Sequence, residues 1–247
     1  MIPYKDENPT ELTPILTVGL IIANVAVWIL VQGMGVPEYL RASVCEFGLI
    51  PVELTDRRVV GPWVCPLGGL TWGALFTSMF MHGSWIHLLT NMMFMWVFGN
   101  NIEDSMGHVR FIIFYLLAGL AAAGAHVGLN SSSGVPTVGA SGAISGILGA
   151  YIVLYPQARV HVFFPPFWIF PMRAYVVLGY WIVIQILMGL SQLGARYGSG
   201  IAVWAHIGGF FAGLVLVKLF ERPQLVGAKR EGRRLDRREI RERHYWW

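Results

Sequence analysis

The sequence predicts an all-α membrane protein, a six-transmembrane-helix bundle with a long membrane-associated first loop. Of the 247 residues, 55% are hydrophobic and only 13% are charged, whereas soluble domains contain about 25% charged residues. The apolar residues also gather in stretches, and about 20 such residues cross a bilayer as a helix. Six such helices would take up about half of the chain. This composition excludes a disordered chain and an ordinary soluble enzyme.

The first predicted span lies in the charge-free stretch Thr13–Gly35. No small-residue cleavage site ends it, so we expect a retained helix rather than a cleaved signal peptide. In the connection that follows, over residues 36–85, the apolar segment LTWGALFTSMFM is too short to span, which predicts an interfacial or re-entrant piece. Five more spans are expected near Trp85–Phe98, Phe111–Leu129, Ser141–Tyr155, Tyr175–Leu193 and Ile201–Phe220.

Positive charge is concentrated at the C-terminal end, where ten of the 18 Lys and Arg residues lie from Lys218 onward. The chain therefore divides into a short N-terminus (1–12), a helical domain (13–220) and a basic tail (221–247). The tail is interpreted as a solvated helix, or alternatively as an interfacial anchor with aromatic residues at the lipid headgroups. Basic and aromatic residues do not interleave elsewhere, so we expect membrane lipids and no nucleic acid as partners.

Both cysteines, Cys45 and Cys65, lie in the long connection after the first span. We expect this connection on the outer face of the membrane, away from the cytoplasm. In an oxidising compartment the two cysteines would be able to form a disulfide there. Two free thiols at the membrane surface are the alternative, and the sequence leaves both open.

Polar side chains within the apolar spans are the candidates for a functional site, because hydrocarbon penalises them unless they find a partner or water. No Asp or Glu lies well inside a predicted span, which argues against a proton relay or a cation transporter. The polar residues are Asn24, His87, Asn91, His126, Ser141, Ser145, Gln185 and His206.

Glycines four residues apart follow both Ser141 and His206: Gly142 with Gly146, and Gly209 with Gly213. Such small faces let two membrane helices approach almost backbone to backbone. If these two helices pack together, Ser141 and His206 come within hydrogen-bond distance, as a nucleophile and its general base must. Close packing without chemistry is the alternative. Both residues, however, lie near the start of their helices, at a shallow depth that water can reach.

His87 and Asn91 are four residues apart and therefore share one helix face, with His82 five residues earlier. Imidazole and amide N–H groups are suitable donors to the oxyanion of an acyl-transfer intermediate. An interhelical polar clamp is the plainer alternative. A metal site from His82, His87 and His206 would lack both a carboxylate and HExxH spacing, so we expect no metal.

In this order and spacing, the motifs resemble those of the rhomboid intramembrane serine proteases, from about Thr13 to Phe220. The family's G-x-S-G pattern stands at Gly139 to Gly142, its A-H-x-x-G pattern at Ala205 to Gly209, and its H-x4-H-x3-N pattern at His82, His87 and Asn91. Each motif alone is a weak signal, whereas three in order within six predicted spans are a strong one.

The resemblance implies a serine endopeptidase that cleaves single-span membrane proteins within or near their transmembrane segment, without a cofactor. It implies Ser141 as the nucleophile and His206 as the general base. The oxyanion hole would consist of His87, Asn91 and the backbone N–H of Ser141. The segment near Trp72 would be the membrane-embedded first loop and the fifth span the lateral gate for substrates. Supporting positions would be His82, Gly139, Gly142 and Gly209.

Two positions depart from the pattern of some family members. Trp72 is followed by Gly73 where some members have Arg, so no arginine role is carried over. Ser145 stands where some members have a tyrosine that packs on the histidine ring, and we expect its hydroxyl to bond back to a carbonyl one turn earlier. Because no buried Asp is available, the sequence predicts a Ser141–His206 dyad and leaves open what orients His206.

With the basic tail, the resemblance further predicts a bacterial inner (plasma) membrane, with both termini cytoplasmic. Two alternatives for function remain at this point. One is a catalytically inactive rhomboid-like protein that binds transmembrane segments. The other is a small transporter, which would explain the six spans but not the pattern of Ser, His and Asn.

Overall fold

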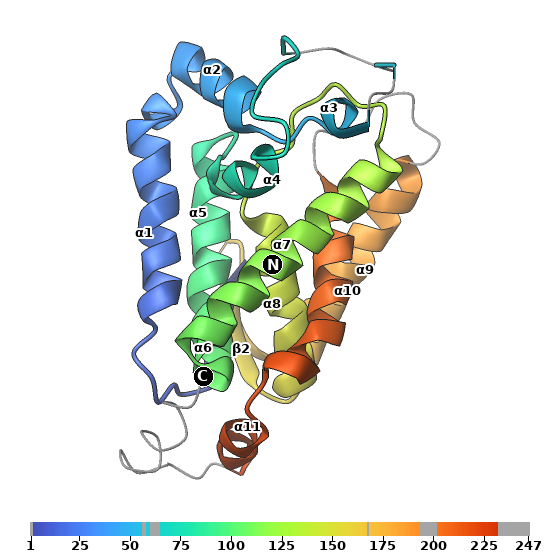
Figure 1. Cartoon of the computed structure of the whole chain (residues 1–247). Helices are drawn as coiled ribbons and strands as arrows, with labels where there is room; N and C mark the ends of the chain where they lie inside the picture. Colours follow the sequence, from blue (N-terminus) through green and yellow to red (C-terminus); the bar gives the residue numbers. More distant parts are fainter. Residues whose placement is uncertain (1, 56–57, 60–64, 167, 193–201, 232–247) are drawn as a thin grey trace.

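The computed structural model describes the chain except for residues 1, 56–57, 60–64, 167, 193–201 and 232–247. The described chain forms a helical bundle with α2, α3 and α4 at one end and α6 and α11 at the other (Figure 1). Three of the described helices are long and apolar enough to cross a membrane: α7 (His108–Leu129), α9 (Ala174–Gln192) and α10 (Val203–Phe220). The predicted boundaries at Leu193 and Ile201, and most of the basic tail, lie outside the described residues.

The remaining predicted spans correspond to shorter helices. α1 (Ile15–Leu30) lies within the charge-free stretch, and α8 (Ser141–Leu154) begins at the predicted residue; both are apolar. The second predicted span is part of a longer helical segment, which continues past its apolar residues to Met106. There α5 (Trp85–Phe94), the π-helical segment η3 (Met95–Gly99) and α6 (Asn100–Met106) follow one another without a break.

Short helical elements occupy the connection between α1 and α5. The disulfide between Cys45 and Cys65 joins α2 to the segment before α4, which decides between the two alternatives that the sequence left open. The apolar segment LTWGALFTSMFM contains the last two of these elements. In chain order they are η1 (Gly33–Gly35), α2 (Pro37–Phe47), α3 (Pro51–Thr55), α4 (Ala74–Thr77) and η2 (Ser78–Phe80).

The prediction of an all-α protein is wrong in one respect, because the chain also forms a three-stranded antiparallel sheet in the order β1–β2–β3. β1 (Ile2–Asp6) pairs with β2 (Arg159–Phe164), which pairs in turn with β3 (Trp168–Arg173). Along β2, Val160 and Val162 are buried while their neighbours are more exposed, the period-two pattern of a strand. This pattern is short, and its partner β1 is distant in sequence, so the sequence alone did not reveal the sheet.

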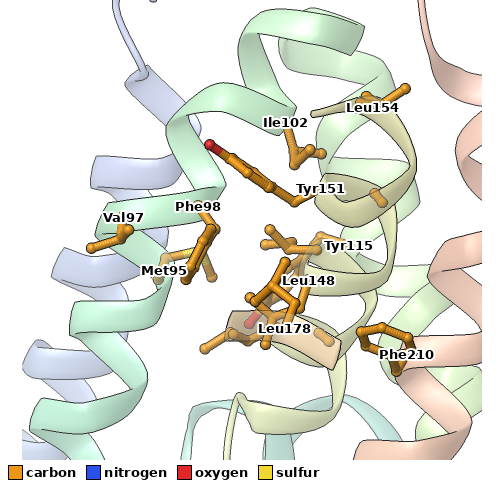
Figure 2. Close-up of a cluster of buried hydrophobic side chains, with 14 of the residues drawn as sticks. Met95, Val97, Phe98, Ile102, Tyr115, Leu148, Tyr151, Leu154, Leu178 and Phe210 are labelled. Atoms are coloured by element: carbon orange, nitrogen blue, oxygen red, sulfur yellow. The ribbon is translucent and has the colours of Figure 1, made fainter. Parts of the chain in front are cut away.

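The hydrophobic core is formed by η3, α6, α7 and α8, with side chains of α9 and α10 packed against them (Figure 2). Phe98 packs edge to face on Tyr151, with ring centroids 5.0 Å apart, a favoured geometry for aromatic pairs. Leu148 and Tyr115 are almost fully buried in the same cluster. The core therefore ties the long helical segment from α5 to α6 to the central helix α8.

α8 and α10 pack backbone against backbone through their glycines. A Cβ atom added to Gly209 would overlap the carbonyl oxygen of Gly142, and one added to Gly213 would overlap that of Gly146. No larger residue leaves room for this approach, so glycine is required at both α10 positions. The predicted packing of the two glycine faces is thereby confirmed.

A network of polar groups joins the chain segments at the α6 end of the bundle. Glu103, buried in α6, accepts hydrogen bonds from backbone N–H groups of the first turn of α1, the shorter at 2.7 Å from Thr17. These N–H groups have no partner within their own helix. The neighbouring Asp104 accepts from the N–H of Leu12 at 2.7 Å and pairs with Lys229 of α11 (Pro223–Arg230) at 2.7 Å.

Asp6 docks the end of β1 onto this network. Its Oδ2 accepts hydrogen bonds from the Tyr151 hydroxyl at 2.6 Å and from Asn101 Nδ2 at 2.8 Å. Burial raises the pKa of Asp6 from its ordinary 3.8 to about 6, although these hydrogen bonds and the charge of Lys229 oppose the change.

We expect the Gly213→Ala substitution to lower the free energy of unfolding by about 1–3 kcal/mol, because its methyl group forces α10 away from the Gly146 carbonyl. Thermal unfolding in detergent measures the change. Gly179→Ala in α9 is the matched control, since a Cβ there meets nothing within 4 Å. Equal melting temperatures for the two variants would contradict the packing argument.

We expect docking of β1 to weaken as the pH rises through the interval from 3.8 to about 6, because the docked strand favours the protonated form of Asp6. The difference between these pKa values corresponds to roughly 3 kcal/mol, fully lost above pH 6. Amide hydrogen exchange in β1 at a series of pH values tests this. Asp6→Asn should remove the dependence and protect β1 at pH 8, and an unaltered pH dependence in this variant would refute the assignment.

Candidate active site

Ser141 and His206 come together where α8 and α10 begin. Ser141 is the first residue of α8 and His206 lies in the first turn of α10. His206 Nε2 is 2.8 Å from Ser141 Oγ, a hydrogen bond between residues 65 positions apart. The glycine contact between the two helices makes this short distance possible, because it brings their backbones together one turn further along.

The loop before α8 has a conformation that only glycine adopts easily. Gly139 has a φ of +129°, and its N–H donates to the Ser78 carbonyl at 2.9 Å, which ties the loop to η2. A Cβ atom at Gly139 would lie 2.8 Å from His87 Nε2 and 3.4 Å from Ser141 Oγ. The absent side chain thus leaves the space between the serine and His87 open.

His87 lies in the first turn of α5 with a defined orientation. The side chain of Ser84 caps the helix by accepting the His87 N–H at 3.1 Å. The Gly83 N–H donates to His87 Nδ1 at 3.3 Å, so in the neutral ring the proton is on Nε2. His87 therefore presents an N–H donor toward Gly139 and the serine loop.

Asn91 lies one turn after His87 on the same face of α5, and it is 6% exposed. Its buried Nδ2 has no hydrogen-bond partner within the described part of the chain. A buried donor without a partner costs about 1–3 kcal/mol. Asn91 Nδ2 is therefore a buried N–H donor without a partner among the described residues, one turn from His87.

His82 lies next to His87, and both of its buried ring nitrogens lack a hydrogen-bond partner within the described residues. Its backbone is clamped by Gln32, whose Oε1 accepts the His82 N–H at 2.8 Å and whose Nε2 donates to the His82 carbonyl at 2.7 Å. The His82 ring packs edge to face on that of His87, with centroids 5.0 Å apart. Among the described residues, no group of three or more His, Cys, Asp or Glu side chains is arranged to hold a metal ion.

The sequence named Gln185 as a polar residue within a span but did not assign it a role. In the structure its Oε1 lies 2.9 Å from His206 Nδ1, the nitrogen that faces away from the serine. Trp181, one turn earlier on α9, packs its ring 5.9 Å from that of His206. The Trp181–Gln185 spacing of four places both on one helix face, but no pattern in the sequence indicates that this face meets His206.

Ser145 and His126 complete the surroundings of the site. Ser145 Oγ donates to the Ser141 carbonyl at 2.6 Å, which confirms the predicted bond to the preceding turn. His126 of α7 pairs through Nε2 with the Thr137 hydroxyl at 2.8 Å, and its buried Nδ1 has no partner within the described residues. Thr137 lies in the loop that leads to Ser141, so this pair holds that loop against α7.

Comparison with known proteins identifies the family. Residues 70–223, more than half of the chain, match the family model described as the Rhomboid domain. The chain belongs to the rhomboid family. Ser141, His206, His87 and Asn91 all lie within the matched rhomboid domain, whereas α1 precedes it.

Relatives of this rhomboid protein are found among eukaryotes. It is 26% identical to the RHOMBOID-like protein 6, mitochondrial, of Arabidopsis thaliana, over 86% of this chain and 70% of that protein. It is 27% identical to the Rhomboid protein 1, mitochondrial, of Saccharomyces cerevisiae, over 58% of this chain and 40% of that protein. It is 29% identical to the human Presenilin-associated rhomboid-like protein, mitochondrial, over 53% of this chain and 35% of that protein. The chain thus spans less than half of the yeast and human relatives.

The predicted location, a bacterial plasma membrane with both termini cytoplasmic, is wrong, because these relatives contradict it. All three are eukaryotic proteins named as mitochondrial. The prediction failed because hydropathy and the distribution of Lys and Arg report that a chain crosses a membrane and how it is oriented, but not to which compartment the membrane belongs.

Proposed function

We propose that this rhomboid protein is an intramembrane serine endopeptidase that cleaves single-span membrane proteins within or near their transmembrane segment. The 2.8 Å contact between Ser141 Oγ and His206 Nε2 is the observation that carries the proposal. Ser141 would be the nucleophile and His206 the general base, which is the minimum arrangement for nucleophilic acyl transfer. The unpartnered Asn91 donor, one turn after His87 on α5, supports the same reaction.

The proposed reaction proceeds by acyl transfer. His206 Nε2 takes the proton of Ser141 as Oγ attacks a peptide carbonyl, and it then gives that proton to the leaving amine. Water, deprotonated by His206, releases the acyl-enzyme. The side chains of His87 and Asn91 and the Ser141 N–H would donate to the oxyanion, since the first N–H groups of a helix lack intrahelical partners.

We further propose that the chain crosses the membrane six times, as α1, the continuous segment α5–η3–α6, α7, α8, α9 and α10. The three-part division 1–12, 13–220 and 221–247 is proposed with it. The connection carrying α2 to α4 would lie at the membrane surface, where its exposed Trp72 meets lipid headgroups.

α9 is the proposed entry side for substrates, and transmembrane proteins and membrane lipids are the proposed partners. The outward face of α9 exposes large apolar side chains, among them Tyr180, Val183 and Leu187, which suit contact with lipid or with a substrate helix. A substrate helix must unwind locally before cleavage, because its carbonyls are already hydrogen-bonded. Small or helix-breaking residues are therefore expected near the cleaved bond.

We expect both Ser141→Ala and His206→Ala to abolish cleavage of a labelled single-span substrate by the detergent-purified protein. A fluorophosphonate probe should label the wild-type serine and not the Ser141→Ala variant. Ser145→Ala, which removes a neighbouring hydroxyl in the same helix, is the control and should still be labelled. Cleavage that persists in both active-site variants would refute the dyad. A wild-type protein that is neither labelled nor active, but binds the substrate segment, would favour an inactive relative.

We expect Asn91→Ala to slow cleavage by about 10²- to 10³-fold, or about 2.7–4 kcal/mol of transition-state stabilisation, because it removes an oxyanion donor. The ratio of kcat/KM values measures this loss. Thr90→Ala, at an exposed neighbour on α5, is the matched control. A loss below about 1 kcal/mol would show that Asn91 only packs between helices.

A further inference from the structure

The side chain of Gln185 determines which nitrogen of His206 carries the proton. Its contacting atom is Oε1, 2.9 Å from His206 Nδ1. An amide oxygen only accepts hydrogen bonds, so His206 Nδ1 must be the donor. A neutral imidazole has one N–H, and its other nitrogen, Nε2, is then left with the lone pair. That lone pair faces Ser141 Oγ at 2.8 Å, as a general base requires.

Among the described residues, no other group around His206 accepts its Nδ1–H. His87 of α5 and His126 of α7 are the titratable groups that act on it electrostatically, and neither is an acid. The Ser145 hydroxyl donates to the Ser141 carbonyl instead of contacting the ring. Within the described residues, the acceptor for the His206 Nδ1–H therefore comes from α9.

α9 also restrains the plane of the ring. Trp181 lies one turn before Gln185 on the same helix face, and its ring is tilted 40° from that of His206 at a centroid distance of 5.9 Å. Gln185 itself is 9% exposed, so little water competes for its amide oxygen. Helix α9 thus provides both a hydrogen bond and a packing surface to the base.

We propose that Gln185 is the positioning residue of His206, in the place that an Asp occupies in a Ser–His–Asp triad. This inference rests on the proposed peptidase function. When His206 accepts the Ser141 proton at Nε2, the Nδ1–H stays on the ring and continues to donate to Gln185, so no proton reaches the amide. The amide holds the tautomer and the ring orientation without introducing a charge into an apolar bundle, where an unpaired carboxylate is costly.

The rate at which a fluorophosphonate probe labels Ser141, measured from pH 5.5 to 9, tests the proposal without knowledge of the natural substrate. Gln185→Met keeps the length of the side chain but removes the acceptor, and it should slow labelling about tenfold or more. Gln185→Glu keeps an acceptor and should restore most of the rate. Ser191→Ala, an exposed polar position near the end of α9, is the control and should leave labelling unchanged.

The pH dependence separates positioning from a purely structural role. The carboxylate introduced by Gln185→Glu stabilises protonated His206, so a higher pH is needed to obtain the free base. The acidic limb of the labelling profile should therefore move to higher pH by about one unit or more. A role in packing alone would change the melting temperature and leave this limb in place.

Each remaining outcome decides the question. Wild-type rates and an unmoved limb in both Gln185 variants would overturn the positioning role but leave the proposed function intact. Equal slowing in both variants with an unmoved limb would overturn it as well. If Gln185→Met fails to fold in thermal unfolding assays, the limb of Gln185→Glu decides alone. A folded wild-type protein that is never labelled would reject the proposed function, and the positioning role with it.

Discussion

The contact between the glycine faces of α8 and α10 is the constraint on which the rest of the structure depends. Each helix carries one member of the Ser141–His206 pair in its first turn. The 2.8 Å between their side chains requires a backbone separation that no Cβ atom permits. In lipid, such packing takes the place of the hydrophobic effect as the force between helices. The same small residues that bring the helices together thus also bring the two reactive groups together.

The buried carboxylates of the described chain, Glu103 and Asp104, lie at the α6 end of the bundle and not at the candidate site. Glu103 and Asp104 are buried in α6, but their oxygens accept hydrogen bonds from N–H groups in the first turn of α1 and just before it. Asp104 also pairs with Lys229. The candidate site uses neutral groups: an amide in Asn91, an amide in Gln185 and imidazoles. A neutral donor or acceptor needs only one good hydrogen bond to be tolerated in a low-dielectric interior, whereas a carboxylate needs several or a counter-charge.

Much of the fold was predictable because it is local. Apolar stretches of helical length predicted where α7, α9 and α10 lie, and glycine spacing predicted which faces pack. The sheet and the true length of the second helical segment were missed. β1 pairs with a strand more than 150 residues away, and α6 continues the helix through polar residues that find their partners only in the folded chain. The predicted location was wrong because composition indicates that a chain enters a membrane but not to which compartment that membrane belongs.

The residues alone predict that the chain lies in a membrane and is mainly helical. They also place serine, histidine and asparagine in apolar helices, where a polar side chain without a partner is costly. These properties follow from composition and periodicity within single elements. Only the tertiary structure decided that Gln185 meets His206, that Cys45 and Cys65 are joined, and that Asp6 meets Tyr151. Each of these contacts depends on the distance between residues far apart in the chain, which is set by how closely the helices pack rather than by any local pattern.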